Sequence, residues 1–353
     1  MSPGRLLPLD GLRLLCCLAV VAGHAAWGPV MGRAASLGVD IFFALSGFLI
    51  TRLLLAERER TGHIDLRAFY LRRARRILPL YYAAVLVAYL LTAALGLRFT
   101  IPFSGIGNQQ FFTTTLLAHL ALIPNLIEVP LPSPLEVLWS IGVEEQFYLV
   151  FPLVLLASPA PRPALRPVAI GLLLCWGVRA YLASVGDASL YRNPLAHGDG
   201  LLLGALAAQI EASSPAALGW LSRHAWWVEL SLCVALLLHL VYRTSSVSPA
   251  AYVLSFLASA LLAAALVLTL ATGAGPLARA LARISGLGKL TYAGYLFHTY
   301  ATKGAFGLVR LLALPEAIVV PARLLGSCVF TLVLAAIAHR LIERPFSASR
   351  RQG

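Results

Sequence analysis

The sequence predicts an all-α protein that crosses a membrane about ten times. Two observations predict this class: the composition and the regular recurrence of apolar runs. Of the 353 residues, 59% are hydrophobic and only 12% are charged, whereas soluble domains carry about 25% charged residues. Apolar runs of spanning length recur along the whole chain. We therefore expect a single integral membrane domain over residues 1–353.

Ten apolar runs are candidates for spanning helices, although the sixth is short. They cover residues 12–31, 37–55, 78–97, 138–157, 167–185, 198–212, 225–242, 250–272, 290–312 and 319–341. A further run, 111–127, is interrupted by His119, Pro124 and Asn125. Whether that run spans the membrane has to be decided from the distribution of charge.

Basic residues determine the expected topology. The segment 52–76 contains eight arginines, so we predict a cytoplasmic loop there. If 111–127 does not span, the later basic loops and the arginine-rich C-terminus are cytoplasmic as well. We therefore predict ten spans in the cytoplasmic (inner) membrane, both termini inside, and an external loop at 98–137 with a re-entrant or surface helix. The same placement explains the net charge of +13 without nucleic-acid binding, because the basic residues lie between apolar spans.

The first span carries two ionisable side chains on one face. Arg13 and His24 are eleven residues apart, about three helical turns, which separates them by about 16 Å along the axis. Ionisable residues inside a span are costly and are functional candidates by default. A neutral imidazole at His24 can take a proton from a hydroxyl that attacks an acyl carbonyl. The pattern favours an anion site at one end of the helix and proton chemistry at the other.

Carboxylates on two other spans are expected at the depth of His24. Asp40 is interpreted either as a partner that orients His24 or as a helix cap. Adjacent Glu144 and Glu145 point about 100° apart, so both cannot face one site. We favour Glu144 as the inward acid, with a helix cap as the alternative. Gly38 and Gly47 are expected to permit close helix packing.

Together with the Arg-x10-His pattern, five segments resemble a known family in their order and spacing. They are GVDIFFALSGFLIT (38–51), FYLRRARRILPLYY (69–82), LWSIGVEEQFYLVFP (138–152), LGKLTYAGYLFHTY (287–300) and a terminal ERP (343–345). The ordered set resembles the acyltransferase-3 family of integral membrane acyltransferases. The resemblance implies transfer of an acyl group, often acetyl, from cytoplasmic acyl-CoA to a hydroxyl. It leaves the acceptor open among carbohydrates, lipid-linked sugars and small metabolites.

The resemblance also implies roles for individual residues. Arg13 and His24 match the functional arginine and histidine, and Glu144 occupies the family's acidic position. Arg72, Arg73 and Arg76 match a basic motif that suits the phosphates of coenzyme A, and positive-inside anchoring is an equally strong interpretation.

Three further side chains are candidates for contact with substrate. Trp139 and Tyr148 are expected along the acceptor path, with an interfacial position as the alternative for Trp139. His298 is expected either to line the acyl channel or to pack without chemistry. The Glu343–Pro345 segment is expected to form a structural salt bridge.

The predicted mechanism uses acyl-CoA as a co-substrate, with no tightly bound cofactor and no metal. Acyl-CoA docks on the cytoplasmic arginines, and His24 acts as general base, supported by Asp40 or Glu144. A covalent acyl-histidine intermediate is the alternative chemistry. A proton-coupled transporter or a flippase without acyl chemistry is the alternative class; no inverted repeat favours it.

Overall fold

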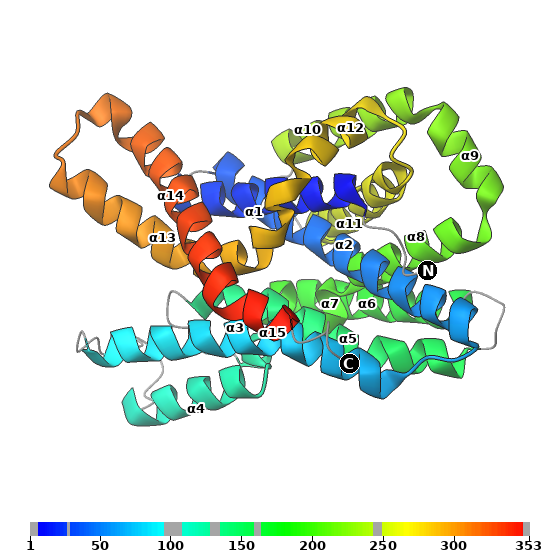
Figure 1. Ribbon diagram of the computed structural model, residues 1–353, viewed down its shortest axis with the longest axis horizontal. Helices are drawn as coiled ribbons and strands as arrows, with labels where there is room; N and C mark the ends of the chain where they lie inside the picture. Colours follow the sequence, from blue (N-terminus) through cyan, green and yellow to red (C-terminus); the bar gives the residue numbers. More distant parts are fainter. Residues whose placement is uncertain are drawn as a thin grey trace.

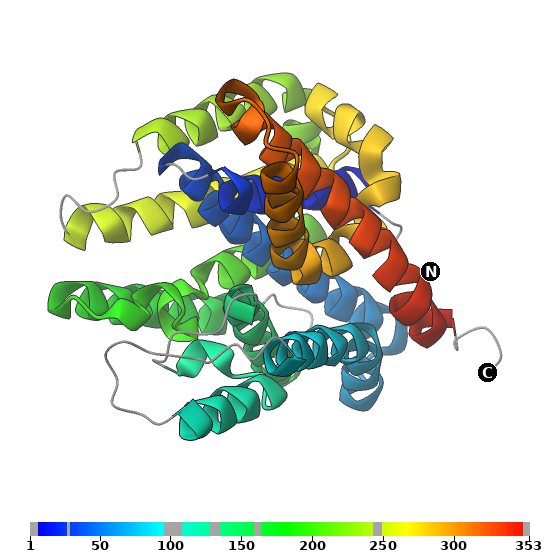
Figure 2. The ribbon, with the colours of Figure 1, turned by 90° about the vertical axis from the view of Figure 1, so that its left-hand side faces the viewer.

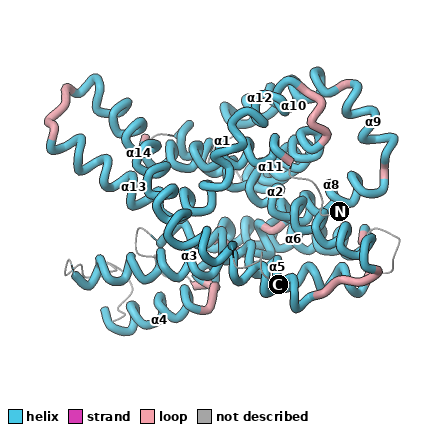
Figure 3. Tube along the Cα trace, viewed as in Figure 1, coloured by secondary structure: helices cyan, strands magenta, loops and turns pink. Residues whose placement is uncertain are grey.

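The computed structural model describes residues 6–26, 29–94, 108–127, 135–158, 164–242 and 249–348. These residues form helices joined by short loops and contain no strand, as Figure 3 shows. The predicted all-α polytopic class is therefore confirmed for the described chain.

Each of the ten predicted apolar runs coincides with a helix. The helices are α1 (Leu7–Ala25), α2 (Pro29–Thr61), α3 (Leu66–Ala94), α5 (Trp139–Ala157), α6 (Leu165–Val185), α8 (Asp199–Ser213), α10 (Ala225–Tyr242), α11 (Pro249–Ala271), α13 (Thr291–Leu311) and α14 (Glu316–Ala338). Within the described residues, seven helices are long and apolar enough to span, or eight if α8 and the helix that follows it at a 99° bend form one span. The count of ten spans stays a prediction.

Shorter helices connect these elements. They are α4 (Asn108–Leu120), α7 (Pro194–His197), α9 (Pro215–Arg223), α12 (Pro276–Ile284) and α15 (Arg344–Ala348), with a π-helical segment at His339–Glu343 between α14 and α15. The predicted external loop 98–137 contains α4 and a 3-10 turn at Pro124–Leu126. Its residues 98–107 and 128–134 lie outside the described residues.

The basic segment 52–76, predicted as a cytoplasmic loop, is helical over most of its length, and its cytoplasmic position stays a prediction. Helix α2 continues to Thr61 and α3 begins at Leu66. With 33 residues, α2 is about 50 Å long and exceeds the hydrocarbon thickness of about 30 Å. The arginines therefore lie on rigid helical extensions, which fixes the direction of each side chain.

Helix α1 lies at the centre of the bundle. It packs against α2, α12, α13 and α14, and Figure 1 shows it between the α13–α14 pair and the α10–α12 group. In the view of Figure 2, α3 to α6 lie below it, and α14 runs past it from the top of the molecule to the lower right. This position brings both ends of α1 against helices from the second half of the chain.

Glycines allow the central helices to cross with their backbones in contact. A methyl group on Gly47 of α2 would overlap the backbone carbonyl of Leu201 in α8, and one on Gly204 of α8 would overlap that of Ala44. A methyl group on Gly38 would lie 3.0 Å from the carbonyl oxygen of Cys16 in α1. The predicted packing role of Gly38 and Gly47 is confirmed.

Candidate active site

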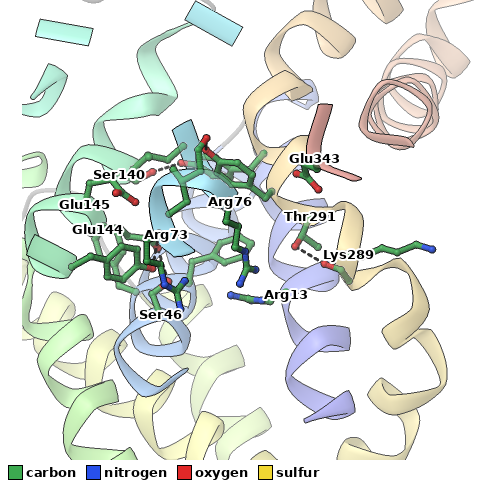
Figure 4. Close-up of a pocket in the computed structure, with 18 of the residues that line it drawn as sticks. Arg13, Ser46, Arg73, Arg76, Ser140, Glu144, Glu145, Lys289, Thr291 and Glu343 are labelled. Carbon is green, nitrogen blue, oxygen red and sulfur yellow. Dashed lines mark hydrogen bonds between the residues drawn. The ribbon is translucent and has the colours of Figure 1, made fainter. Parts of the chain in front are cut away.

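A cavity of about 410 Å³ lies beside the N-terminal half of α1. Its walls come from α1, α2, α3, α5, the start of α13 and the π-helical segment, and Figure 4 shows the side chains that line it. Its titratable lining residues are Asp10, Arg13, Arg73, Arg76, Glu144, Glu145, Tyr148, Lys289, Tyr292, Tyr295, His339 and Glu343. The sequence elements predicted to form a site thus meet around one space.

Three arginines form the basic part of this cavity. Arg13 comes from α1, and Arg73 and Arg76 come from α3; Figure 4 shows their guanidinium groups converging. Arg73 lies over the Tyr148 ring, with its guanidinium carbon 5.4 Å from the ring centroid. Converging guanidinium groups repel one another, and a bound anion such as a phosphate relieves that repulsion through paired hydrogen bonds.

Arg72, the fourth predicted arginine, takes a different position. A step of one residue turns a helical side chain by about 100°. Arg72 accordingly does not line the cavity. It forms an ion pair with Glu57 of α2, with 2.9 Å between Nη2 and the carboxylate oxygen. The predicted group of four arginines therefore separates into three at the cavity and one in an ion pair between helices.

Glu144 lies in the cavity together with Arg13. Its carboxylate accepts hydrogen bonds from Ser46 Oγ at 2.8 Å and from the Tyr148 hydroxyl at 3.3 Å. The expected depth near His24 was wrong, because α5 does not start at the surface of the bundle. A buried 3-10 turn, Leu135–Leu138, precedes α5 and carries its first residues into the interior.

Glu145 also lines the cavity, which contradicts the expectation that only one of the two adjacent glutamates can face it. The cavity borders α5 over a part of its surface that is wide enough to include both side chains. The alternative interpretation of Glu144 as a helix cap was also wrong, because its carboxylate accepts from side chains of α2 and α5 and not from the first amides of α5.

Asp40 is buried in the middle of α2, so its interpretation as a helix cap was wrong; α2 begins at Pro29. Its carboxylate oxygen lies 2.8 Å from Nε2 of His197. His197 in turn stacks on Trp139, with 5.7 Å between ring centroids. Trp139 is only 6% exposed and is absent from the cavity lining among the described residues, so its interfacial alternative was wrong.

His24 and His298 meet outside the cavity lining of the described residues. His24 is exposed and is not part of the lining within the described residues. His298 is fully buried, and its ring meets that of His24 at 4.8 Å between centroids. Tyr295, one turn before His298, lines the cavity and shares a 2.6 Å hydrogen bond with Ser140. One face of α13 therefore leads from the cavity to His24.

The ERP segment contributes to the cavity through its first residue. Glu343 forms an ion pair with His339 inside the π-helical segment, at 2.5 Å between Nδ1 and the carboxylate oxygen. Both side chains line the cavity. Among the described residues the segment thus bonds through Glu343 to His339, as an ion pair when His339 is protonated, and the contact belongs to the wall of the cavity.

Four buried polar residues that form contacts between helices were missed by the sequence analysis. They are Ser46, Arg179, His197 and Asp199. Ser46 meets Glu144 and His197 meets Asp40 across 98 and 157 residues of sequence. Because no local pattern connects such distant positions, only the packing of the helices reveals these pairs.

Comparisons with known proteins agree with this arrangement. Residues 7–340 match the family model of the acyltransferase-3 acyltransferase domain. The peptidoglycan O-acetyltransferase OatA of Listeria monocytogenes is 36% identical over 151 residues, which are 42% of this chain and 24% of that protein. The O-acetyltransferase OatA of Staphylococcus aureus is 33% identical over 214 residues, 59% of this chain and 35% of that protein.

The chain matches only about a quarter to a third of the length of these curated relatives, and no solved structure matches it. The family match nevertheless covers nearly the whole sequence and includes α1, α3, α5 and α13, which build the cavity. This chain therefore belongs to the acyltransferase-3 family of acyltransferases, and it is a multi-pass membrane protein.

Proposed function

We propose that this protein is a membrane O-acyltransferase that moves an acyl group, acetyl in the simplest case, from cytoplasmic acyl-CoA to a hydroxyl of a glycan. The proposal rests on one observation: the helix α1 carries both His24 and one of the three arginines that line the cavity. Arg13 belongs to that cavity, and His24 lies about 16 Å further along α1.

The arginines suit the donor. Coenzyme A carries several phosphate charges at one end and its thioester at the end of a long flexible arm. Arg13, Arg73 and Arg76 would hold the phosphates in paired hydrogen bonds. The arm would then extend past Ser140 and Tyr295, along the face of α13 that leads from the cavity to His24.

His24 suits the role of general base. Its Nδ1 lies 2.9 Å from the backbone oxygen of Val20. A carbonyl oxygen only accepts hydrogen bonds, so Nδ1 carries the hydrogen and Nε2 of the neutral ring keeps its lone pair. Nε2 would take the proton of the acceptor hydroxyl as its oxygen attacks the thioester carbon. The C–S bond then breaks, and coenzyme A leaves as a thiolate that recovers the proton.

The acceptor is proposed as a glycan because the relative in Listeria monocytogenes is named a peptidoglycan O-acetyltransferase. His24 is exposed in the described chain, so a bulky acceptor can approach it from outside the bundle. The donor and the acceptor would thus reach His24 from opposite sides.

Release of free thiol from acetyl-CoA tests the donor and the arginine site together. We expect purified protein to release thiol when peptidoglycan fragments are added. Arg73→Ala removes a charge-assisted contact of about 1.5–3 kcal/mol and should raise the KM for acetyl-CoA about 10- to 100-fold. Arg72→Ala is the matched control: it removes the neighbouring arginine, which pairs with Glu57 outside the cavity, and should leave KM nearly unchanged. Equal effects of the two substitutions would contradict the proposed phosphate site.

The same assay tests the base. His24→Ala should lower kcat about 10²- to 10⁴-fold, the usual contribution of general base catalysis. His224→Ala is the control, because His224 is also exposed and its Nδ1 also bonds the carbonyl four residues earlier, that of Trp220. Unchanged kcat in His24→Ala would refute the mechanism. Absence of thiol release by the wild type would refute use of acetyl-CoA as donor and favour a transporter.

Kinetic order separates the two chemical routes. Direct transfer requires donor and acceptor to be bound together and predicts sequential kinetics. An acyl-histidine intermediate on His24 predicts ping-pong kinetics and acyl transfer to the protein in the absence of acceptor.

A further inference from the structure

His24 is in contact with a second imidazole that comes from the other half of the chain. The rings of His24 in α1 and His298 in α13 meet edge to face, with 4.8 Å between centroids and 71° between planes. The two helices pack together. Two histidines that touch inside a membrane bundle are unusual, because an ionisable residue in this environment is retained mainly where it has a function.

Backbone carbonyls fix the tautomer of both rings in the same way. Nδ1 of His298 donates to the backbone oxygen of Tyr295 at 2.7 Å, and Nδ1 of His24 donates to that of Val20 at 2.9 Å. Each neutral ring therefore keeps its lone pair on Nε2. Neither ring is free to exchange the roles of its two nitrogens without breaking a hydrogen bond to the backbone.

The two lone pairs lie in different surroundings. His24 is exposed, whereas His298 is fully buried and its Nε2 has no hydrogen-bond partner within the described chain. Leaving a buried acceptor without a donor costs free energy. Such an atom in a native protein calls for an explanation, and a catalytic role is one of the recognised ones.

The reaction at His24 places a positive charge beside the unpaired lone pair of His298. When His24 takes the proton of the acceptor hydroxyl it becomes an imidazolium, and the ring of His298 is in contact with it. The attraction between this charge and the lone pair is stronger away from water. The interaction therefore becomes favourable only after proton transfer, which is the condition for lowering the barrier.

We infer that His298 is a positioning residue for the transfer: its ring, with an unpaired lone pair on Nε2, lies against His24 and stabilises the positive charge that His24 carries while it is an imidazolium. The acceptor hydroxyl loses its proton to His24, its oxygen forms the new C–O bond, and the C–S bond breaks. The proton then passes from His24 to the coenzyme A thiolate, so His24 returns to the neutral state. This inference rests on the proposed function of His24.

The test measures kcat and the KM for acetyl-CoA in His298→Ala and His298→Gln. The amide oxygen of glutamine can accept a hydrogen bond but cannot hold a proton. We expect kcat to fall at least about tenfold in the alanine variant and less in the glutamine variant, with KM for acetyl-CoA within about twofold of wild type. Added imidazole should restore part of the activity of the alanine variant, because it supplies the missing lone pair.

His119→Ala is the matched control. His119 is also fully buried, and its Nδ1 also bonds a backbone carbonyl, that of Thr115, but it lies on α4 away from the cavity lining. Loss of kcat in this variant would show that removal of any buried imidazole lowers activity through packing, and would overturn the inference.

Two other results would overturn it: wild-type kcat in His298→Ala, or equal loss in both His298 variants without rescue by imidazole. If His298→Ala does not fold, the glutamine variant decides, because a reduced kcat at unchanged KM supports the inference and a wild-type kcat refutes it. A wild-type protein that releases no thiol would instead contradict the proposed function, so the two failures are distinguishable.

Discussion

Loss of the buried ion pair between α6 and α8 should destabilise the fold strongly. Arg179 and Asp199 are each only 1% exposed, with 2.5 Å between Nη2 and Oδ1. Arg179 also donates from Nε to the backbone oxygen of Ala196 at 2.6 Å, and Asp199 accepts from Trp176 at 3.3 Å and from the Gly200 amide at 3.1 Å. Removal of one partner leaves the other charge buried without compensation.

The expected magnitude follows from this burial. Arg179→Met should cost about 3–5 kcal/mol, the range for breaking a buried pair from one side. At about 2 °C per kcal/mol for a chain of this size, the midpoint of thermal unfolding should fall by about 6–10 °C. Adding Asp199→Asn removes the orphaned charge and keeps an acceptor for Trp176 and Gly200. The double variant should therefore be more stable than Arg179→Met alone.

The assay is the thermal midpoint of detergent-solubilised protein, followed as the fraction that stays monodisperse after heating. Arg192→Met is the control, because Arg192 pairs with Glu136 at 3.1 Å in an exposed position and should contribute at most about 1 kcal/mol. A midpoint for Arg179→Met within 2 °C of the control, or losses that simply add in the double variant, would refute the reasoning.

Substitutions at two further positions test the packing that holds the site. Gly204→Val places a side chain against the backbone carbonyl of Ala44. The free energy of unfolding should therefore fall by at least about 1–3 kcal/mol, and the thermal midpoint should fall with it. Unchanged stability would show that α2 and α8 can separate freely. Glu229 of α10 is 2% exposed and accepts hydrogen bonds from the amides of Leu277 and Ala278 at the start of α12, at 2.7 and 3.1 Å. Glu229→Ala should cost about 1–3 kcal/mol, and Glu229→Gln, which keeps one acceptor oxygen, should cost less. Equal midpoints for these two variants would contradict the capping role.

The helices of this protein could be predicted from the sequence because apolar runs are local. Each predicted run matched a helix, and the residues on one helix face, such as Arg73 and Arg76, were found together in the cavity. Errors arose where position depends on a distant element. Glu144 was expected near His24, but the buried turn before α5 places it in the lining of the same cavity as Arg13.

Contacts between side chains on different helices could not be predicted from the sequence. Asp40 was predicted either to orient His24 or to cap a helix, but its carboxylate lies against His197. His197 had no recognisable pattern, because its partner is set by how α2 crosses α7 and α8. The same holds for Ser46 and Glu144. Contacts of this kind depend on helix register, which hydrophobicity alone does not specify.

Because Arg13 and His24 lie on one unbroken helix, α1 holds them at a fixed distance from each other. A loop between two anchoring groups can stretch or refold, but the hydrogen-bonded ladder of α1 cannot. Movements of the surrounding helices therefore leave the distance from the cavity to the imidazole unchanged. Only an insertion or deletion inside α1 alters it, and a single added residue would turn His24 by about 100°, away from α13. The gap between the two groups should accordingly tolerate substitutions far better than any change in length.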